Sequence, residues 1–343
     1  MQNLRLFKSL FLAATTLILV ACTGNANKEK PVKNGVDAEI LNLQDSTLYF
    51  YSEINPINKI KGKEASFKIQ IDVDSNGIFV RPLNLEEGYY ILEHDNIRSL
   101  YFIEKGKRLS LDFDAAKPTE QPDFSGALKY ESRYLYDRFL AHAQFTSKQK
   151  AYFTYSEADF VNEVNQLRGK LDTALVTYIT NHPTGSAYFM EQESLTNLYF
   201  SAAYLEAYPA KRTINTPLSE TYYAKLNQLD INNQKAINNP AFYLYIQNYV
   251  WSRVGAPVNT QNVYQQINFV DTAISVPEYQ DFLLFQSAKE VALWTNNENK
   301  SQMLDTLATL IHHPEIKAFL LQNIQNDTAA LSLKQNQTIT QDQ

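Results

Sequence analysis

The sequence contains a single cysteine, Cys22, among its 343 residues. One cysteine cannot form a disulfide within the chain, and thiol–disulfide exchange needs a second cysteine to resolve the mixed disulfide. We therefore exclude dithiol redox chemistry. Glycine is also scarce, at 10 residues, whereas tyrosine and phenylalanine number 22 and 19. Low glycine with many aromatic residues indicates helical packing around large core side chains rather than a loop-rich fold.

Positive charge and catalytic motifs are lacking as well. Lysine and arginine number 31 against 37 acidic residues, which gives a net charge of −6 and no basic patch, so we exclude nucleic acid as a partner. The sequence contains no G-x-S-x-G, no P-loop and no H-E-x-x-H. The pair His312-His313 has no second cluster near it in the sequence. We therefore expect no metal, no cofactor and no catalytic residues.

The first 21 residues have the pattern of a secretory signal peptide. Arg5 and Lys8 precede the apolar run LFLAATTLILVA, which is too short to span a bilayer permanently. The run ends in LVAC (19–22), which resembles the lipobox of bacterial lipoprotein precursors. That resemblance implies acylation of the Cys22 thiol and cleavage that makes Cys22 the new N-terminus. The alternative is an ordinary signal peptide in which the cysteine occurs by chance.

The segment after the cysteine predicts a flexible tether over residues 22–37. Its sequence, TGNANKEKPVKNGVD, is polar and contains glycine, asparagine and proline. Thr23 stands where aspartate would be the inner-membrane retention signal of enteric lipoproteins. The resemblance thus implies a lipid anchor in the cell envelope, in the outer membrane, with either leaflet open.

Residues 38–126 predict an antiparallel β-sandwich. Short segments alternate apolar and polar residues at period two, with turn residues between them, at 46–54, 65–73, 77–83, 88–94, 98–104 and 108–114. Regularly spaced short strands of this kind are typical of antiparallel sandwiches and barrels.

Residues 127–328 predict an all-α bundle or array, so the expected fold class is α+β, with a frayed tail over 329–343. A helix begins at the capping box Ser156-x-x-Asp159 and stops at His182-Pro183. Its apolar residues recur at helical spacing: Phe160, Val164, Leu167, Leu171, Leu175 and Tyr178. Further helices are expected at 186–208, 219–229, 241–254, 277–296, 300–311 and 314–326.

Part of the β region resembles a known family. The motifs are GYY at 88–90, LYFIEKG at 100–106, LSLDFD at 109–114 and Phe124-x-Gly126. They are similar to the N-terminal β-domain of thioredoxin-like disulfide-reductase lipoproteins of Bacteroidetes-type bacteria. The family's Trp-Cys-x-x-Cys motif is absent from this sequence, so its redox activity does not transfer. The resemblance instead implies a partner role towards a separate thioredoxin-like envelope protein.

Two sets of candidate site residues stand out. Tyr130, Tyr134 and Trp251 belong to aromatic clusters that could line a groove between the domains, or fill a core instead. Asp followed by Ser or Thr resembles the O-glycosylation acceptor of Bacteroidetes exported proteins, with helix capping as the alternative. The candidate acceptors are Ser46, Thr173, Thr272, Thr306 and Thr328.

The sequence thus predicts a lipid-anchored cell-envelope protein that binds or scaffolds without catalysing a reaction. A second hypothesis is a surface lipoprotein that binds glycans or nutrients through its aromatic residues. An unrecognised hydrolase is a third, less favoured interpretation.

Overall fold

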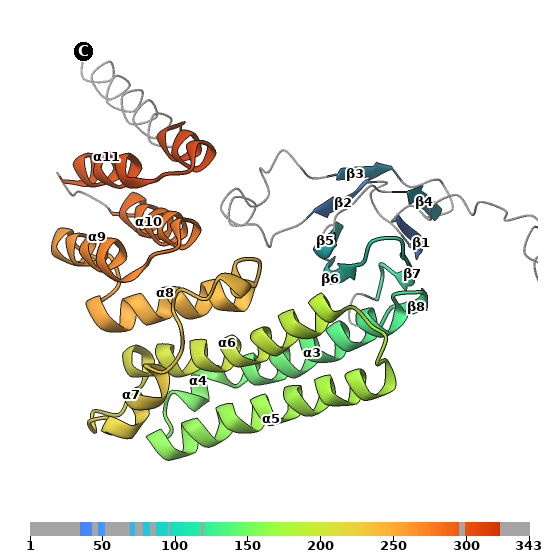
Figure 1. The fold of residues 1–343 in the computed structure, drawn as a ribbon, viewed down its shortest axis with the longest axis horizontal. Helices are drawn as coiled ribbons and strands as arrows, with labels where there is room; N and C mark the ends of the chain where they lie inside the picture. The colour runs from blue at the N-terminus through green and yellow to red at the C-terminus, as the bar shows by residue number, and fades with distance from the viewer. Residues whose placement is uncertain are drawn as a thin grey trace, which may run out of the picture.

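The computed structural model describes residues 35–42, 47–51, 69–72, 78–82, 87–94, 97–117, 120–294 and 299–322. Cys22, Ser46, Thr328, the signal segment and the tail 329–343 lie outside these residues. Within the described part the chain is mixed α+β, with strands first and helices after them (Figure 1). This agrees with the predicted fold class.

The strands form two four-stranded sheets, of order β4-β1-β7-β8 and β3-β2-β5-β6. Their bounds are β1 Gly35–Leu41, β2 Thr47–Tyr51, β3 Ile69–Asp72, β4 Ile78–Pro82, β5 Gly88–His94, β6 Ile97–Ile103, β7 Arg108–Asp114 and β8 Asp123–Gly126. β5 and β7 have the predicted bounds, and β2, β3 and β4 lie inside their predicted segments. Side chains from both sheets pack into one core, including Val36, Ile40, Phe50, Leu92, Leu109 and Leu111.

Two features of the sheets differ from the sequence prediction. β1 begins at Gly35, inside the segment predicted as tether, and β8 was not predicted at all. β1 also pairs parallel to β7, with Val36 opposite Leu109, so the expectation of a fully antiparallel domain is wrong for this pair. The remaining pairs are antiparallel.

The helices follow one another in a layered array (Figure 1). Their bounds are α3 Lys129–Ser147, α4 Gln149–Tyr152, α5 Glu157–Asn181, α6 Ala187–Lys211, α7 Glu220–Leu226, α8 Pro240–Val254, α9 Thr260–Ala273, α10 Pro277–Ala292 and α11 Lys300–Leu310. The short 3₁₀ helix η2 spans Gln234–Ala236, and residues 314–322 are also helical. α3 and α9 were not predicted as separate helices. In the described residues no helix is both long and apolar enough to cross a membrane.

α5 is the helix for which the structure confirms the predicted cap and the predicted buried residues most fully. The Ser156 side chain accepts a hydrogen bond from the Asp159 N–H at 3.2 Å, as a capping box requires. All six apolar residues that were predicted to face the core are buried. The helix ends at Asn181, two residues before Pro183.

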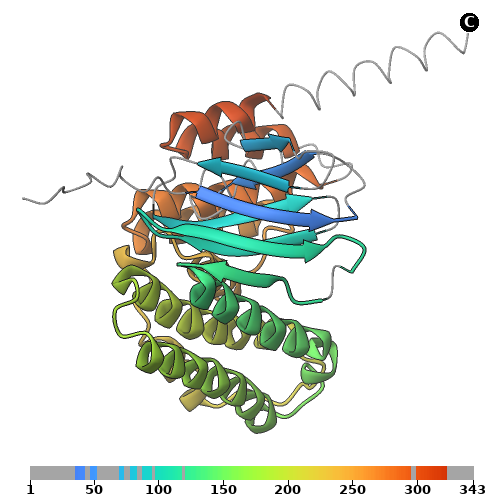
Figure 2. The same cartoon turned by 90° about the vertical axis from the view of Figure 1, so that its right-hand side faces the viewer.

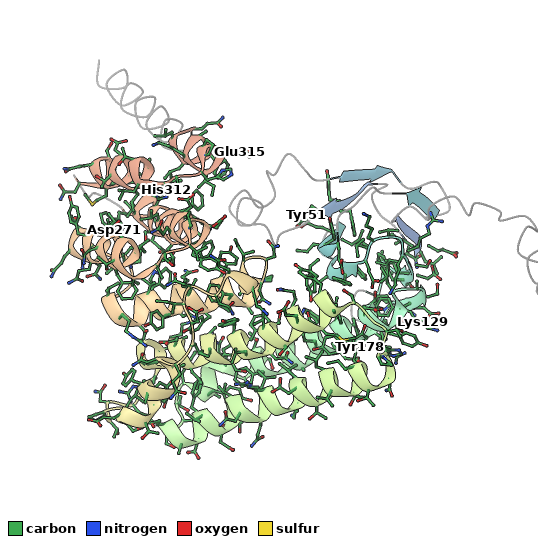
Figure 3. All side chains as sticks on the ribbon, in the orientation of Figure 1. Tyr51, Lys129, Tyr178, Asp271, His312 and Glu315 are labelled. Carbon is green, nitrogen blue, oxygen red and sulfur yellow. The ribbon has the colours of Figure 1, made fainter. Side chains whose placement is uncertain are left out.

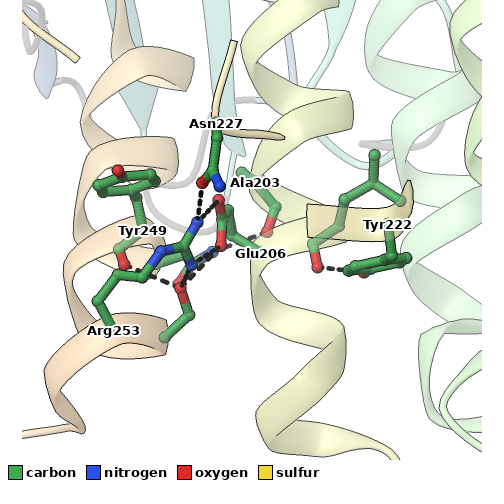
Figure 4. A network of polar contacts seen from close by, with 9 residues as sticks. Ala203, Glu206, Tyr222, Asn227, Tyr249 and Arg253 are labelled. Carbon is green, nitrogen blue, oxygen red and sulfur yellow. Dashed lines mark hydrogen bonds and ion pairs between the residues drawn. The ribbon is translucent and has the colours of Figure 1, made fainter. Parts of the chain in front are cut away.

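A buried ion pair joins three helices, α6, α7 and α8 (Figure 4). Glu206 on α6 is 1% exposed and accepts hydrogen bonds from Ser252, at 2.7 Å, and from the Arg253 guanidinium, at 3.0 Å. Arg253 also donates to Asn227, the C-cap of α7, and lies over the Tyr249 ring. Charge and hydrogen bonds satisfy the buried carboxylate, so we assign this cluster a structural role.

α3 lies across the open edges of both sheets. β6 and β8 are each the last strand of their sheet, and α3 packs against both (Figure 2). Covering the edges in this way protects unpaired strand groups from other chains. A second core cluster continues from the strands into α3, α5 and α6, and its members are Tyr89, Phe102, Tyr134, Leu135, Leu175, Tyr178 and Phe189.

Candidate functional site: a cavity between the sheet edges and α3

A cavity of about 370 Å³ lies where α3 spans the two sheet edges. Its lining comes from β5, β6, β7, β8 and the segment leading into β8 on one side, and from α3 and α6 on the other. Most of the lining is apolar, and its apolar residues include Leu100, Tyr101, Phe124, Tyr136, Phe139 and Phe200. The volume falls within the range of small-molecule sites, about 300–1,000 Å³.

One face of α3 forms the floor of the cavity. Ser132, Leu135, Tyr136, Phe139 and His142 line it, and their spacing of three, four, seven and ten residues places them on one side of a helix. Phe139 is 61% exposed, so the cavity opens to solvent beside this ring. The opposite face of α3 packs against α5 and α6.

Two polar atoms of this floor are buried without a hydrogen-bond partner. Ser132 is 1% exposed, and neither its Oγ nor His142 Nε2 has a partner among the described residues. Ser201 and Ser287, in other helices, instead donate to the carbonyl four residues earlier, at 2.9 and 3.0 Å. An unsatisfied buried polar atom costs about 1–3 kcal/mol, so two in one cavity call for an explanation.

His142 is uncharged in this environment. Burial and then the neighbouring Arg138 guanidinium lower the pKa of its imidazole to about 3. Its ring contacts the Phe200 ring, with centroids 4.2 Å apart. The cavity therefore contains a neutral imidazole at neutral pH.

Arg138 lines the cavity, but a buried carboxylate balances its charge. Glu193 on α6 is fully buried, and its Oε2 lies 3.1 Å from Arg138 Nε. The Tyr89 hydroxyl of β5 donates to Glu193 Oε1 at 2.6 Å. Burial, followed by the charge of Glu193, raises the pKa of Tyr89 well above its usual value. Glu193 thus links a strand to two helices at the wall of the cavity.

The three aromatic residues predicted to line an inter-domain groove, Tyr130, Tyr134 and Trp251, are not among the residues that line this cavity. Tyr134 is buried on the other side of α3, with its ring 5.7 Å from that of Tyr178. Tyr130 is half-exposed and stacks on His182 at 3.8 Å. Trp251 lies half-buried against the helical core. The sequence showed that aromatic residues crowd the segment that forms α3, but not which of them face the sheets.

Three candidate glycosylation acceptors lie inside helices rather than at caps. Thr173 is on α5, Thr272 on α9 and Thr306 on α11. Each hydroxyl donates to the carbonyl four residues earlier, at 2.7, 2.7 and 2.8 Å respectively. Thr173 and Thr272 are exposed. Glycosylation of these residues stays a prediction.

The adjacent histidines His312 and His313 have a structural environment. Asp281 on α10 is 3% exposed and accepts hydrogen bonds from the backbone N–H groups of both, at 2.7 Å each. His312 lies between α11 and the helix that contains Glu315 (Figure 3). In the described residues no three His, Cys, Asp or Glu side chains gather in a way that could hold a metal ion.

Comparisons with known proteins do not indicate a function, so the cavity is the main guide to it. No family model, no curated protein and no solved structure matches the chain. The similarity of the β region to thioredoxin-like lipoproteins therefore stays a prediction from its motifs.

Proposed function

We propose that this protein is a non-enzymatic binding protein of the cell envelope, anchored by lipid on Cys22, and that the cavity beneath the sheet edges is its ligand site. The observation that carries the proposal is the pair of buried, unpartnered polar atoms, Ser132 Oγ and His142 Nε2, in an apolar cavity. A ligand that hydrogen-bonds these atoms removes their desolvation cost and supplies apolar surface to the walls.

We also propose where the protein is anchored, how its β region folds and which kind of partner it has. The lipobox-like LVAC supports an outer-membrane anchor. The polar segment after Cys22 supports a tether that holds the folded part away from the lipid surface. The core shared by the two sheets supports a β-sandwich next to the helical array. The similarity of the β region supports a separate thioredoxin-like protein as an envelope partner.

Ligands that co-purify with the protein from its native envelope test the cavity. We compare wild type with Leu100→Trp, which places a large ring where half-buried Leu100 lines the cavity. Leu244→Trp is the matched control, because Leu244 lies on α8, is 37% exposed and is not part of the lining. Mass spectrometry of organic extracts should find small molecules with wild type and Leu244→Trp that are lost from Leu100→Trp. Equal recovery from all three proteins contradicts the proposed site.

Metabolic labelling tests the anchor separately. Wild-type protein in its native host should incorporate radiolabelled palmitate and sediment with outer membranes. Cys22→Ala should incorporate none, because it lacks the thiol that accepts the diacylglycerol. Equal labelling of both chains contradicts the assignment of Cys22.

A further inference from the structure

We infer that the cavity takes an uncharged, elongated and largely apolar molecule with a hydrogen-bonding group at each end. This inference rests on the proposed function, namely that the cavity is a ligand site. It follows from the positions of the unpartnered atoms, from the charges around them and from the nature of the walls.

The shape of the ligand follows from the floor of the cavity. Ser132 and His142 line the cavity on the same face of α3 and are ten residues apart. At about 1.5 Å of rise per residue, their Cα atoms are separated by about 15 Å along the helix. A volume of 370 Å³ spread over that length describes a narrow channel rather than a round pocket. A long, thin molecule fills it.

The polar groups of the ligand follow from the same two residues. Ser132 Oγ and His142 Nε2 are both buried and without partners among the described residues. A hydroxyl can donate or accept, so hydroxyls at the two ends of a ligand satisfy the serine and either tautomer of the imidazole. Between these ends Leu135, Tyr136 and Phe139 present apolar surface.

The absence of charge on the ligand follows from the balance of charges in the lining. Arg138 faces the buried carboxylate of Glu193, 3.1 Å away, and Lys117 is paired with Glu120 at the rim at 3.3 Å. The low pKa of His142 keeps its imidazole neutral. An anion that enters the cavity loses its hydration without gaining an unbalanced cation, and a cation meets no unbalanced carboxylate in the lining.

Calorimetric titration of the full-length protein in maltoside micelles tests this ligand class with three probes of one length. They are 1,10-decanediol, 1-decanol and decanedioate, and titration into Leu100→Trp gives the contribution of the micelles. We expect the diol to bind most tightly and 1-decanol about five-fold more weakly, because one hydrogen bond contributes about 1 kcal/mol. Decanedioate should bind at least ten-fold more weakly than the diol.

Two variants locate the ends of the ligand. Ser132→Ala and His142→Phe should each weaken binding of the diol about five-fold. Leu244→Trp should leave its binding unchanged. Decanedioate binding as tightly as the diol, or a diol no tighter than 1-decanol, overturns the inference about chemistry. If the diol fails but native molecules are still lost from Leu100→Trp, the ligand class is wrong and the site stands. If the diol does not bind and no native molecules are lost from Leu100→Trp, the proposed function is wrong as well.

Discussion

At the residue scale, the structure predicts a large contribution of Glu193 to stability. It is a fully buried carboxylate bound to Arg138 and Tyr89 from two other elements. Removing one partner of a buried pair leaves the other charge unbalanced and costs about 3–5 kcal/mol. Sequence spacing alone could not reveal this, because the three residues are brought together by tertiary packing.

Glu193→Gln should therefore lower the free energy of unfolding by about 3 kcal/mol in urea denaturation. Glu191→Gln is the matched control two residues away, since Glu191 is 45% exposed and its pair with Lys235 lies on the surface. Exposed pairs contribute about 0–1 kcal/mol, so this control should change little. Equal effects of the two substitutions contradict a buried ion pair at Glu193.

His142 predicts a specific dependence of stability on pH. Its pKa is about 3 in the folded protein and about 6.5 when unfolded, so both states are neutral above pH 6.5. Between pH 6.5 and 3 the unfolded chain binds a proton that the folded chain does not, and stability falls as the pH falls. The loss from this residue between pH 7 and 4.5 should be about 2.5 kcal/mol.

His142→Phe removes that titration and keeps a ring beside Phe200. Its unfolding free energy should fall less than that of wild type between pH 7 and 4.5, measured by urea denaturation at both values. Other groups titrate in both proteins, so the difference between the two curves isolates His142. Parallel curves contradict a buried neutral imidazole.

At the element scale, a carboxylate from another helix binds the chain just before the helix over residues 314–322. Asp281 on α10 binds the N–H groups of His312 and His313, just before that helix begins. Helix N-termini have unsatisfied donors, and a negative charge there is favourable. The sequence showed a proline after two histidines but not the distant acid that binds them.

Asp281→Ala should destabilise the protein by about 2 kcal/mol and speed amide hydrogen exchange in residues 314–322. Asp271→Ala is a suitable control, because Asp271 is an exposed aspartate on the neighbouring α9. It should change neither quantity measurably. Exchange rates in 314–322 that are the same in both variants argue against stabilisation of this helix by Asp281.

Periodicity predicted some elements closely and missed others for physical reasons. β5, β7 and α5 follow from clean period-two and helical patterns. α3 is covered by sheets on one side and by α5 and α6 on the other, so no single apolar stripe marks it. β1 pairs with β7 across 73 residues, and such non-local parallel pairing leaves no local turn signal.

At the scale of the whole molecule, the cavity results from how one helix covers two sheets. Two separate edges, β6 and β8, meet α3 at different places, and the space between them is not filled. The sequence predicted two successive regions and, as one possibility, a groove between them lined by aromatic residues. Ser132 and His142 gave no signal, because a lone serine and a lone histidine in a helix are common.

The most direct test of this account is a crystal structure of the protein soaked with 1,10-decanediol. We predict density for the diol along α3, with one hydroxyl within hydrogen-bond distance of Ser132 Oγ and the other within reach of His142 Nε2. Diol density elsewhere on the molecule, with the space above α3 closed by the side chains of β6 and β8, would contradict it.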